Sequence, residues 1–369
     1  MLDQIPVSRH IVCFWKQNDL GVYGRRADRW IRYWTQHPGV ERIWVVEPAV
    51  GRIQLLRMLE KSVSQDRVES SEFILLLNQL LRKGGGQCDT GKIRFVTELH
   101  WEQAHAAVDV NRLSERLRSQ GMNAPMVVLW PLCSIAIEQI DCLNPSFVLT
   151  DIVDDQRQFK SNQARLSLIQ EQYRQLMAKS DLVISNSLPL VRNLEDEFMR
   201  YVQHVPNEWL PPALASDSVS AVQITACDEY MRSIKTGRVA GYVGNLRERI
   251  DVDRLVNLIS NRQDWSFWFV GQAYKSEFYA RAKHYSNCRF FGSMPRDLAM
   301  TAMSHFDIAL VPFVDDPLTR SMSLLKLEEY NSKGLEVLDF RQMSDARIDH
   351  LLDVSVHAIG KPGRIGGGS

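Results

Sequence analysis

Residues 308–338 read IALVPFVDDPLTRSMSLLKLEEYNSKGLEVL. The apolar run at 308–311 predicts a buried strand, and Pro312-Phe313 leads from it into a polar loop. A helical pattern begins near Leu324 and ends at Gly334, after which the chain becomes apolar again. A strand, a helix and a second strand in this order predict a parallel sheet with crossover helices, which is an α/β fold.

The helix of this segment carries polar residues that suit a bound nucleotide. Its N-terminus offers unpaired N–H groups and a partial positive charge, which favour a diphosphate. Lys326 in the first turn would add a cation, and the Glu329 carboxylate would accept the two hydroxyls of a ribose. Ser323, just before the helix, belongs to the same candidate site. The alternative is a surface helix with a solvated Lys–Glu face.

Short apolar runs and longer helical patterns alternate along the rest of the chain. In the first part, strands are expected at 10–14, 42–46, 92–97, 126–129, 146–150 and 182–185, and helices at 25–36, 71–82, 108–120 and 164–179, with a glycine break at 84–86. In the second part, strands are expected at 239–243, 267–270, 288–291 and 308–311, and helices at 252–259, 276–285, 295–304 and 324–332.

These patterns predict two successive α/β domains. We place the N-terminal, acceptor-binding domain at 1–206, an interdomain connection with a covering helix at 207–236, the C-terminal, donor-binding domain at 237–360 and a flexible tail at 361–369. Open α/β sheets bind ligands at the carboxyl ends of their strands. The sequence therefore predicts a cleft between two sheets.

Composition and charge limit the partners. The chain has 369 residues, 45% of them hydrophobic, and a formal net charge of +0. A chain without net charge has no overall field to attract nucleic acid, so no nucleic-acid partner is expected. No secretory signal pattern opens the chain, and no apolar run is long enough to span a membrane. With its six scattered cysteines, the chain is expected in the cytoplasm.

The segment 308–338 resembles the donor-site signature of family-4-type (glycosyl transferase group 1) enzymes. In that signature a strand and Pro-Phe precede a Lys-Leu-x-Glu-Tyr helix and then Gly-x-x-Val, as at 326–330 and 334–337 here. The resemblance implies a GT-B fold, in which two Rossmann-like domains with parallel sheets face a central cleft. It also implies that Glu329 binds the ribose of a UDP-sugar or GDP-sugar, and that no metal ion or other cofactor is needed.

Residues 241–251 read GYVGNLRERID and resemble the opening of the C-terminal domain in the same enzymes. Gly244 would let backbone N–H groups approach an anion, and Arg247 and Arg249 would bind a diphosphate. The alternative is a tight turn between a strand and a helix. Two further strand-Gly turns resemble those of the family, the second of which usually lies against the nucleobase. They add the following donor-site residues: Gly271, Phe291 and Gly292.

Carboxylates follow the strand expected at 146–150. Asp151, Asp154 and Asp155 lie at its carboxyl end, and a close pair such as Asp154 and Asp155 can serve to deprotonate an acceptor hydroxyl. The segment resembles the Asp-Asp turn of this glycosyltransferase group. It also resembles the base-carrying loop of the membrane-peripheral glucuronosyltransferase of xanthan synthesis, which implies that Asp154 is the base. The alternative is an Asp-rich helix cap.

The loop after the first strand is rich in polar and aromatic residues and contains two glycines. Because it lies at a carboxyl end, we expect it to contact the acceptor or the transferred sugar. The alternative is a glycine-hinged loop with only structural hydrogen bonds. The candidate acceptor-binding residues are Lys16, Asn18, Asp19, Tyr23 and Arg25.

The helix that follows carries arginines and two tryptophans at 25–34. Such a face would allow peripheral contact with an anionic bilayer, at the inner face of the membrane, and would suit a lipid-linked acceptor. The alternative places the tryptophans in the core. Acidic pairs at 251–253 and 315–316 could be metal sites, but we interpret them as helix caps and expect no metal.

These observations predict a glycosyltransferase that moves a sugar from a nucleoside-diphosphate sugar to a saccharide, lipid-linked or other hydroxyl acceptor, in cell-surface glycan synthesis. A sugar-nucleotide epimerase on the same fold is the alternative enzyme. Ser321 stands where the family has the first of two glutamates, and the chain ends soon after residue 338. These departures favour a third alternative, a catalytically degenerate nucleotide-binding or scaffold subunit.

Overall fold

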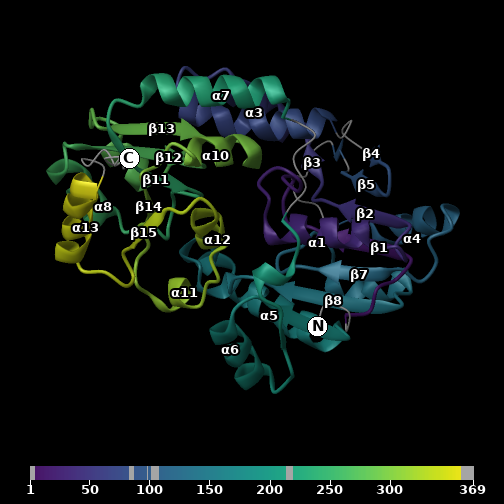
Figure 1. Ribbon diagram of the computed structural model, residues 1–369. Helices are drawn as coiled ribbons and strands as arrows, with labels where there is room; N and C mark the ends of the chain where they lie inside the picture. Colours follow the sequence, from purple (N-terminus) through teal and green to yellow (C-terminus); the bar gives the residue numbers. More distant parts are fainter. Residues whose placement is uncertain (1–4, 83–86, 98, 101–107, 213–218, 359–369) are drawn as a thin grey trace, which may run out of the picture.

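The computed structural model describes residues 5–82, 87–97, 99–100, 108–212 and 219–358. They form two large sheets of mainly parallel strands, flanked by helices (Figure 1). The prediction of an α/β fold is confirmed. The glycine break at 84–86 and the tail at 361–369 lie outside the described residues.

The N-terminal sheet has the strand order β10-β9-β8-β7-β1-β2-β5-β4, and only β4 runs antiparallel to its neighbour. Its strands are His10–Phe14 (β1), Arg42–Val46 (β2), Gln87–Thr90 (β4), Ile93–Val96 (β5), Met126–Leu129 (β7), Phe147–Ile152 (β8), Leu182–Ser185 (β9) and Gln203–His204 (β10). A separate two-stranded sheet pairs Val50–Gly51 (β3) with Leu99–His100 (β6).

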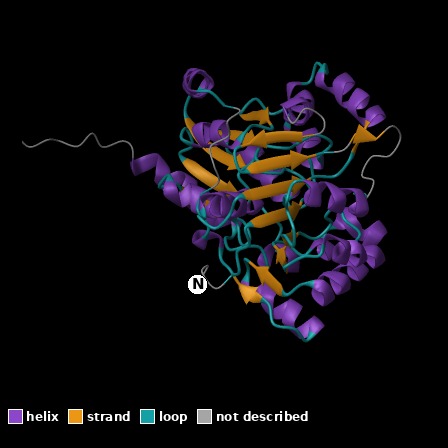
Figure 2. Cartoon of the chain, turned by 90° about the vertical axis from the view of Figure 1, so that its right-hand side faces the viewer, coloured by secondary structure: helices purple, strands orange, loops and turns teal. Residues whose placement is uncertain are grey.

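Helices flank the N-terminal sheet (Figure 2). They are Arg26–Gln36 (α1), Arg52–Ser62 (α2), Arg67–Arg82 (α3), Val110–Ser119 (α4), Leu166–Lys179 (α5) and Leu188–Phe198 (α6), with 3-10 turns at Ile137–Leu143, Gln156–Gln158, Lys160–Arg165 and Asn207–Trp209. The central strand β1 packs against helices on both faces of the sheet. Cys13 packs in one core with Trp30 of α1, and Phe14 packs in another with Leu113 of α4. A strand buried on both faces needs apolar residues at every position, as the run at 10–14 predicts.

The C-terminal sheet has the order β13-β12-β11-β14-β15, with all pairs parallel. Its strands are Arg238–Val243 (β11), Trp265–Val270 (β12), Cys288–Gly292 (β13), Ile308–Val311 (β14) and Glu336–Asp339 (β15). Its helices are Ala221–Ile234 (α7), Val252–Asn261 (α8), Glu277–Ala282 (α9), Arg296–Met303 (α10), Pro317–Arg320 (α11), Leu325–Ser332 (α12) and Asp345–Ala358 (α13). Helix α7 is the covering helix expected within 207–236, and its Met231 is buried in the C-terminal core.

Helix α3 belongs to the first part of the chain but packs on the C-terminal sheet. In Figure 1 it lies beside α7 and close to β13. Val68 of α3 is part of the C-terminal core. Tyr279 Oη donates to Asp66 Oδ2 over 2.6 Å, and the backbone N–H of Ser293 donates to Ser71 Oγ over 3.0 Å. The two sheets are therefore connected by packing at α3 as well as by the chain itself.

The aromatic face of α1 lies in the core, as the alternative for 25–34 expected. Trp30 and Trp34 are both 0% exposed and stack on each other. Arg29 is also buried, and its guanidinium pairs with Glu328 of α12 at 2.8 Å. This face of α1 is therefore not available to a bilayer. Within the described residues, no helix has the length and apolar character needed to cross a membrane.

Candidate functional site

A cavity of about 610 Å³ lies between the carboxyl ends of the two sheets. Its N-terminal wall is formed by the loop after β1, the ends of β7 and β8, and parts of α2 and α3. Its C-terminal wall is formed by the turns after β11, β12 and β13 and by the start of α12. This is the position at which open α/β sheets bind ligands.

Lys326 stands at the centre of the C-terminal wall. Its Nζ donates to Tyr242 Oη over 2.9 Å and lies 4.0 Å from the centre of that ring and 4.6 Å from the ring of Phe313. Burial lowers the pKa of Lys326 well below its ordinary value, and the positive charge of Arg249 lowers this pKa further. An anion beside Lys326 would offset both effects.

Two glycine turns leave room around Lys326. A Cβ on Gly244 would lie 2.8 Å from Lys326 Nζ, and a Cβ on Gly271 would lie 2.0 Å from Gly244 O. Both residues have positive φ angles, +145° and +135°. The backbone N–H of Gly244 is already donated to Val270 O over 2.8 Å, so this N–H does not point to a ligand. Gly244 therefore contributes open space rather than a hydrogen bond.

The two arginines predicted to bind diphosphate differ in their surroundings. Arg249 lines the cavity, with its guanidinium carbon 5.3 Å from the centre of the Phe313 ring. Among the described residues, no carboxylate forms an ion pair with Arg249. Arg247 does not line the cavity, and its Nη2 lies 3.6 Å from Glu72 Oε2 on α3. Arg249 alone is placed to contact an anion in the cavity.

Glu329 faces the cavity from α12, at the edge of the same wall. Its Oε1 lies 3.2 Å from Nε of Arg296, the first residue of α10. Burial raises the pKa of Glu329, and Arg296 opposes this rise. Ser323 also lines the cavity, and its hydroxyl accepts from the side chain of Asn207 at 3.3 Å. These contacts fix both side chains beside Lys326.

The second strand-Gly turn lies outside the cavity lining. Phe291 packs edge-on against Trp268, with ring centres 5.3 Å apart. A Cβ on Gly292 would lie 2.0 Å from Ser71 Oγ. Helix α3 thus covers the turn that the family resemblance assigns to the nucleobase, and neither Phe291 nor Gly292 lines the cavity.

The loop after β1 forms much of the N-terminal wall, and all five candidate acceptor-binding residues line the cavity. Three of them also hold the loop together. Asp19 accepts from Trp15 Nε1 over 2.9 Å and pairs with Arg25 at 2.8 Å, and Asn18 donates to Pro48 O over 2.8 Å. Lys16 has no carboxylate partner among the described residues, and burial lowers its pKa.

The neighbouring aspartates after β8, Asp154 and Asp155, lie in different environments. Asp154 lines the cavity, and its carboxylate has no hydrogen-bond partner within the described part of the chain. Asp155 does not line the cavity, because its carboxylate binds the backbone N–H and the guanidinium of Arg157. Asp155 therefore caps the turn Gln156–Gln158, as the alternative for this segment expected.

A buried network supports this wall. Asp151, at the end of β8, accepts from Arg26 Nε at 2.9 and 3.1 Å and from Trp30 Nε1 at 3.0 Å. Trp130 Nε1 donates to the same carboxylate at 3.3 Å. Arg26 Nη1 also donates to Asn207 Oδ1 at 3.0 Å, which connects the network to the interdomain segment. The Asp151 carboxylate is thus engaged by three protein side chains.

The acidic pairs considered as metal sites have other roles. Asp251 accepts from Arg254 N at the start of α8, and Asp316 accepts from Thr319 N at the start of α11. In the described residues, no group of three His, Cys, Asp or Glu side chains is placed to hold a metal ion. One member of each pair is a helix cap, as interpreted from the sequence, and the other members, Asp253 and Asp315, pair with Arg281 and Arg320.

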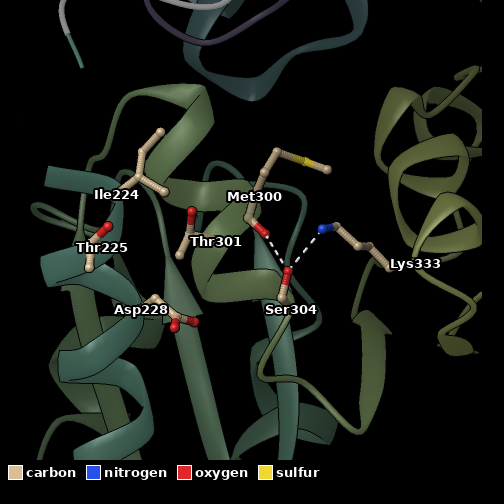
Figure 3. Close-up of a pocket in the computed structure, with 7 residues that line it drawn as sticks. All are labelled: Ile224, Thr225, Asp228, Met300, Thr301, Ser304 and Lys333. Atoms are coloured by element: carbon tan, nitrogen blue, oxygen red, sulfur yellow. Dashed lines mark hydrogen bonds between the residues drawn. The ribbon is translucent and has the colours of Figure 1, made fainter. Parts of the chain in front are cut away.

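A second hollow of about 320 Å³ lies between α7, α10 and the end of α12 (Figure 3). Lys333 Nζ donates to Ser304 Oγ over 2.9 Å, and Asp228 is engaged by His305 Nε2 at 2.8 Å. The polar side chains of this hollow all have hydrogen-bond partners within the protein, and we assign no function to it.

No protein-family model and no curated protein sequence matches the chain. Solved structures match nearly its whole length. Sucrose-phosphate synthase from Thermosynechococcus elongatus is 10% identical over 90% of this chain and 81% of its own, with a TM-score of 0.56. WaaG, a glycosyltransferase involved in lipopolysaccharide biosynthesis, is 14% identical over 94% and 90%, with a TM-score of 0.52. Anabaena Alr3699/HepE in complex with UDP is 11% identical over 95% and 90%, with a TM-score of 0.52.

The fold is GT-B. In this GT-B chain, most of the predicted site residues surround one cavity. Those that line it are Lys16, Asn18, Asp19, Tyr23, Arg25, Asp154, Gly244, Arg249, Gly271, Ser323, Lys326 and Glu329. Those that do not line it are Asp155, Arg247, Phe291 and Gly292.

Several residues that line the cavity of this GT-B structure were not predicted as site residues, among them Gln272, Arg296, Arg26, Glu72 and Asn245. Gln272 follows Gly271 after β12, and Arg296 begins the helix that comes after β13. Both residues thus come after the carboxyl end of a strand, and this position was the signal that could have revealed them. Nothing in the sequence distinguished Arg26 from the other arginines of α1. Glu72 had no such signal, because nothing in the sequence shows that α3 packs on the other sheet.

Proposed function

We propose that this protein is a metal-independent glycosyltransferase that moves a sugar from a nucleoside-diphosphate sugar to a hydroxyl acceptor. The observation that carries this proposal is the environment of Lys326 and Arg249. Two partly buried cations face one cavity, and no carboxylate of the described residues forms an ion pair with either. Uncompensated cations at a functional cleft favour an anionic ligand.

The donor site would lie on the C-terminal wall. Lys326, Arg249 and the orphan N–H groups at the start of α12 would hold the diphosphate, and the space at Gly244 would admit it. Glu329, oriented by Arg296, would accept the ribose hydroxyls. The N-cap residue of α12 is Leu324, which has no side chain able to satisfy those N–H groups.

The acceptor would lie against the N-terminal wall. Asp154 would take the proton of the acceptor hydroxyl as the oxygen bonds to the anomeric carbon. The bond between that carbon and the phosphate oxygen breaks, and the cations stabilise the charge of the departing nucleoside diphosphate. Lys16, Tyr23 and Arg25 would orient the acceptor at this wall.

The structure of Alr3699/HepE holds UDP, which makes UDP the first nucleotide to test and GDP the second. We propose a glycan or lipid-linked acceptor of cell-surface glycan synthesis. No metal ion or other cofactor is required in this scheme, because Lys326 and Arg249 supply the positive charge.

Titration calorimetry with UDP, GDP and ADP tests the donor site. We expect one nucleotide to bind and Lys326→Met to weaken its binding about 10- to 100-fold, the effect of losing a charged hydrogen bond. Lys333→Met is the matched control, because Lys333 follows the opposite end of the same helix and lines the outer hollow. The proposal is wrong if none of the three nucleotides binds.

Turnover assays distinguish the remaining alternatives. Sugar nucleotides incubated with a mixture of oligosaccharide acceptors should yield free nucleoside diphosphate and an extended glycan. Conversion of the sugar nucleotide without an acceptor would instead indicate an epimerase. Nucleotide binding without either reaction would indicate a degenerate subunit.

A further inference from the structure

Three polar side chains, two from the C-terminal sheet and one from α3, meet at the lining of the cavity. Glu72 comes from α3, Asn245 follows β11 and Gln272 follows β12, and all three line the cavity. Gln272 Nε2 donates to Glu72 Oε1, and Asn245 Nδ2 donates to Gln272 Oε1 over 3.1 Å. Gln272 thus holds the other two side chains in fixed orientations.

This arrangement leaves two acceptor atoms without donors. Glu72 Oε2 and Asn245 Oδ1 are buried, and neither has a hydrogen-bond partner among the described residues. The nearest guanidinium nitrogen, Arg247 Nη2, lies 3.6 Å from Glu72 Oε2, beyond hydrogen-bond distance. Burial accordingly raises the pKa of Glu72. A buried acceptor without a donor is unfavourable, so a ligand that brings donors to these atoms is favoured.

The chemistry of these atoms selects the kind of ligand group. Two oxygen acceptors repel a phosphate but accept hydrogen bonds from hydroxyl groups. Asn245 directly follows Gly244, where the diphosphate would enter. The group attached directly to the diphosphate of a sugar nucleotide is the sugar, which carries several hydroxyls.

We propose that Glu72 and Asn245 bind hydroxyls of the transferred sugar and determine which sugar the protein accepts. This inference rests on the proposed function and deepens it. Because Glu72 reaches the cavity from the N-terminal part of the chain, the subsite is complete only while α3 is packed on the C-terminal domain. Asp66 binds Tyr279 of α9, and Ser71 binds Ser293 just after β13.

The test compares the affinity for a free nucleotide with that for its sugar derivatives. Calorimetry would measure binding of UDP, UDP-glucose, UDP-galactose and UDP-N-acetylglucosamine, or the GDP-linked series if GDP is the nucleotide bound. We expect at least one sugar nucleotide to bind the natural protein more tightly than the free nucleotide. Glu72→Ala and Asn245→Ala should each weaken that sugar nucleotide about 10- to 100-fold and change the affinity for the free nucleotide less than about twofold.

Glu69→Ala is the matched control. Glu69 lies one turn earlier on α3, pairs with Lys61 at 2.9 Å and does not line the cavity. It should leave all affinities unchanged. Thermal unfolding would verify that each variant is folded, and if Glu72→Ala is not, Asn245→Ala decides the question, because Asn245 makes no contact with α3 in the described structure.

Two results would overturn the inference while leaving the proposed function intact. In one, no sugar nucleotide binds more tightly than the free nucleotide. In the other, both variants leave the advantage of the sugar nucleotide unchanged, or weaken the free nucleotide equally. If no nucleotide binds the natural protein at all, the proposed function fails first.

Discussion

The two walls of the cavity differ in how their charges are balanced. On the N-terminal wall, Arg26 pairs with Asp151 at 2.9 Å and Arg25 pairs with Asp19 at 2.8 Å. On the C-terminal wall, Lys326 faces the same space with no carboxylate partner in the described residues. The arginines of the first wall are thus paired without a ligand, whereas Lys326 of the second wall is not.

This difference predicts which charged residues stabilise the fold and which bind the ligand. Removing one member of a buried ion pair leaves an uncompensated charge and destabilises the protein. Removing a cation that has no carboxylate partner relieves electrostatic repulsion, so the main loss is affinity for the anionic ligand. Substitutions in the ion pairs of the N-terminal wall should therefore reduce stability, and substitutions of Lys326 or Arg249 on the C-terminal wall should reduce affinity. Lys16 and Asp154 of the N-terminal wall have no ion-pair partner in the described structure and are exceptions.

The largest effect is expected at Asp154, the carboxylate of the N-terminal wall that lacks a partner in the described structure. Asp154→Asn should lower the rate of sugar transfer about 10²- to 10⁴-fold, the usual contribution of a general base, without changing nucleotide affinity. Asp155→Asn is the control. It should lower the melting temperature, since Asp155 binds Arg157, and leave transfer by the folded protein largely unchanged. Equal losses of transfer in both variants would contradict this assignment.

Asp151→Asn should reduce the free energy of unfolding by about 3–5 kcal/mol, because it leaves Arg26 buried without its partner. Urea denaturation measures this. The exposed pair Lys179–Asp141 offers a comparison, and Asp141→Asn should cost less than about 1 kcal/mol. A loss for Asp151→Asn as small as that for Asp141→Asn would show that the wall does not depend on its ion pairs.

Arg249 and Arg247 sharpen the comparison, because they lie two residues apart and only Arg249 lines the cavity. Arg249→Met should weaken nucleotide binding about 10- to 100-fold, since it removes a charged contact to the diphosphate. Arg247→Met should change the affinity less than about threefold. Calorimetry would measure the nucleotide affinity of both variants. A larger loss of affinity for Arg247→Met than for Arg249→Met would place the diphosphate elsewhere.

The smallest effect is a dependence of binding on pH. The pKa of Lys326 is lowered in the free protein, so as pH rises through this lowered value the side chain loses its proton and an anion must restore it on binding. Nucleotide affinity should therefore fall with rising pH at values below about 10.4, the ordinary pKa of lysine. Calorimetry across an alkaline series should show this decline in the natural protein, and Lys326→Met should lack it. An equal decline in both would assign the effect to another group.

The sequence was most informative where function depends on residues close together in the chain. Alternation of apolar runs and helical patterns was sufficient for the α/β fold, and Lys326 and Glu329, selected from the helix after β14, line one cavity in the structure. Gly244 lines the same cavity, but the structure gives it a different physical role from the one predicted. Its backbone N–H is used within the sheet, and its lack of a side chain makes space for Lys326.

The errors and omissions concern contacts between distant segments. Asp154 and Asp155 are neighbours, and only the position of Arg157 and the turn after it decides which carboxylate faces the cavity. The site at Gly292 is covered by Ser71 of α3, and Glu72 enters the cavity from the same helix. No local pattern shows which sheet a helix covers, because any apolar face can pack on either.

Helix α3 also limits how the two halves of the molecule can move. The chain passes between the sheets once more after residue 206, so the halves are joined at two separate places. Gln79 of α3 also binds the N-terminal half, where its Nε2 donates to Leu20 O over 2.9 Å. Any opening that separates α3 from the C-terminal domain must therefore break the Asp66–Tyr279 and Ser71–Ser293 hydrogen bonds.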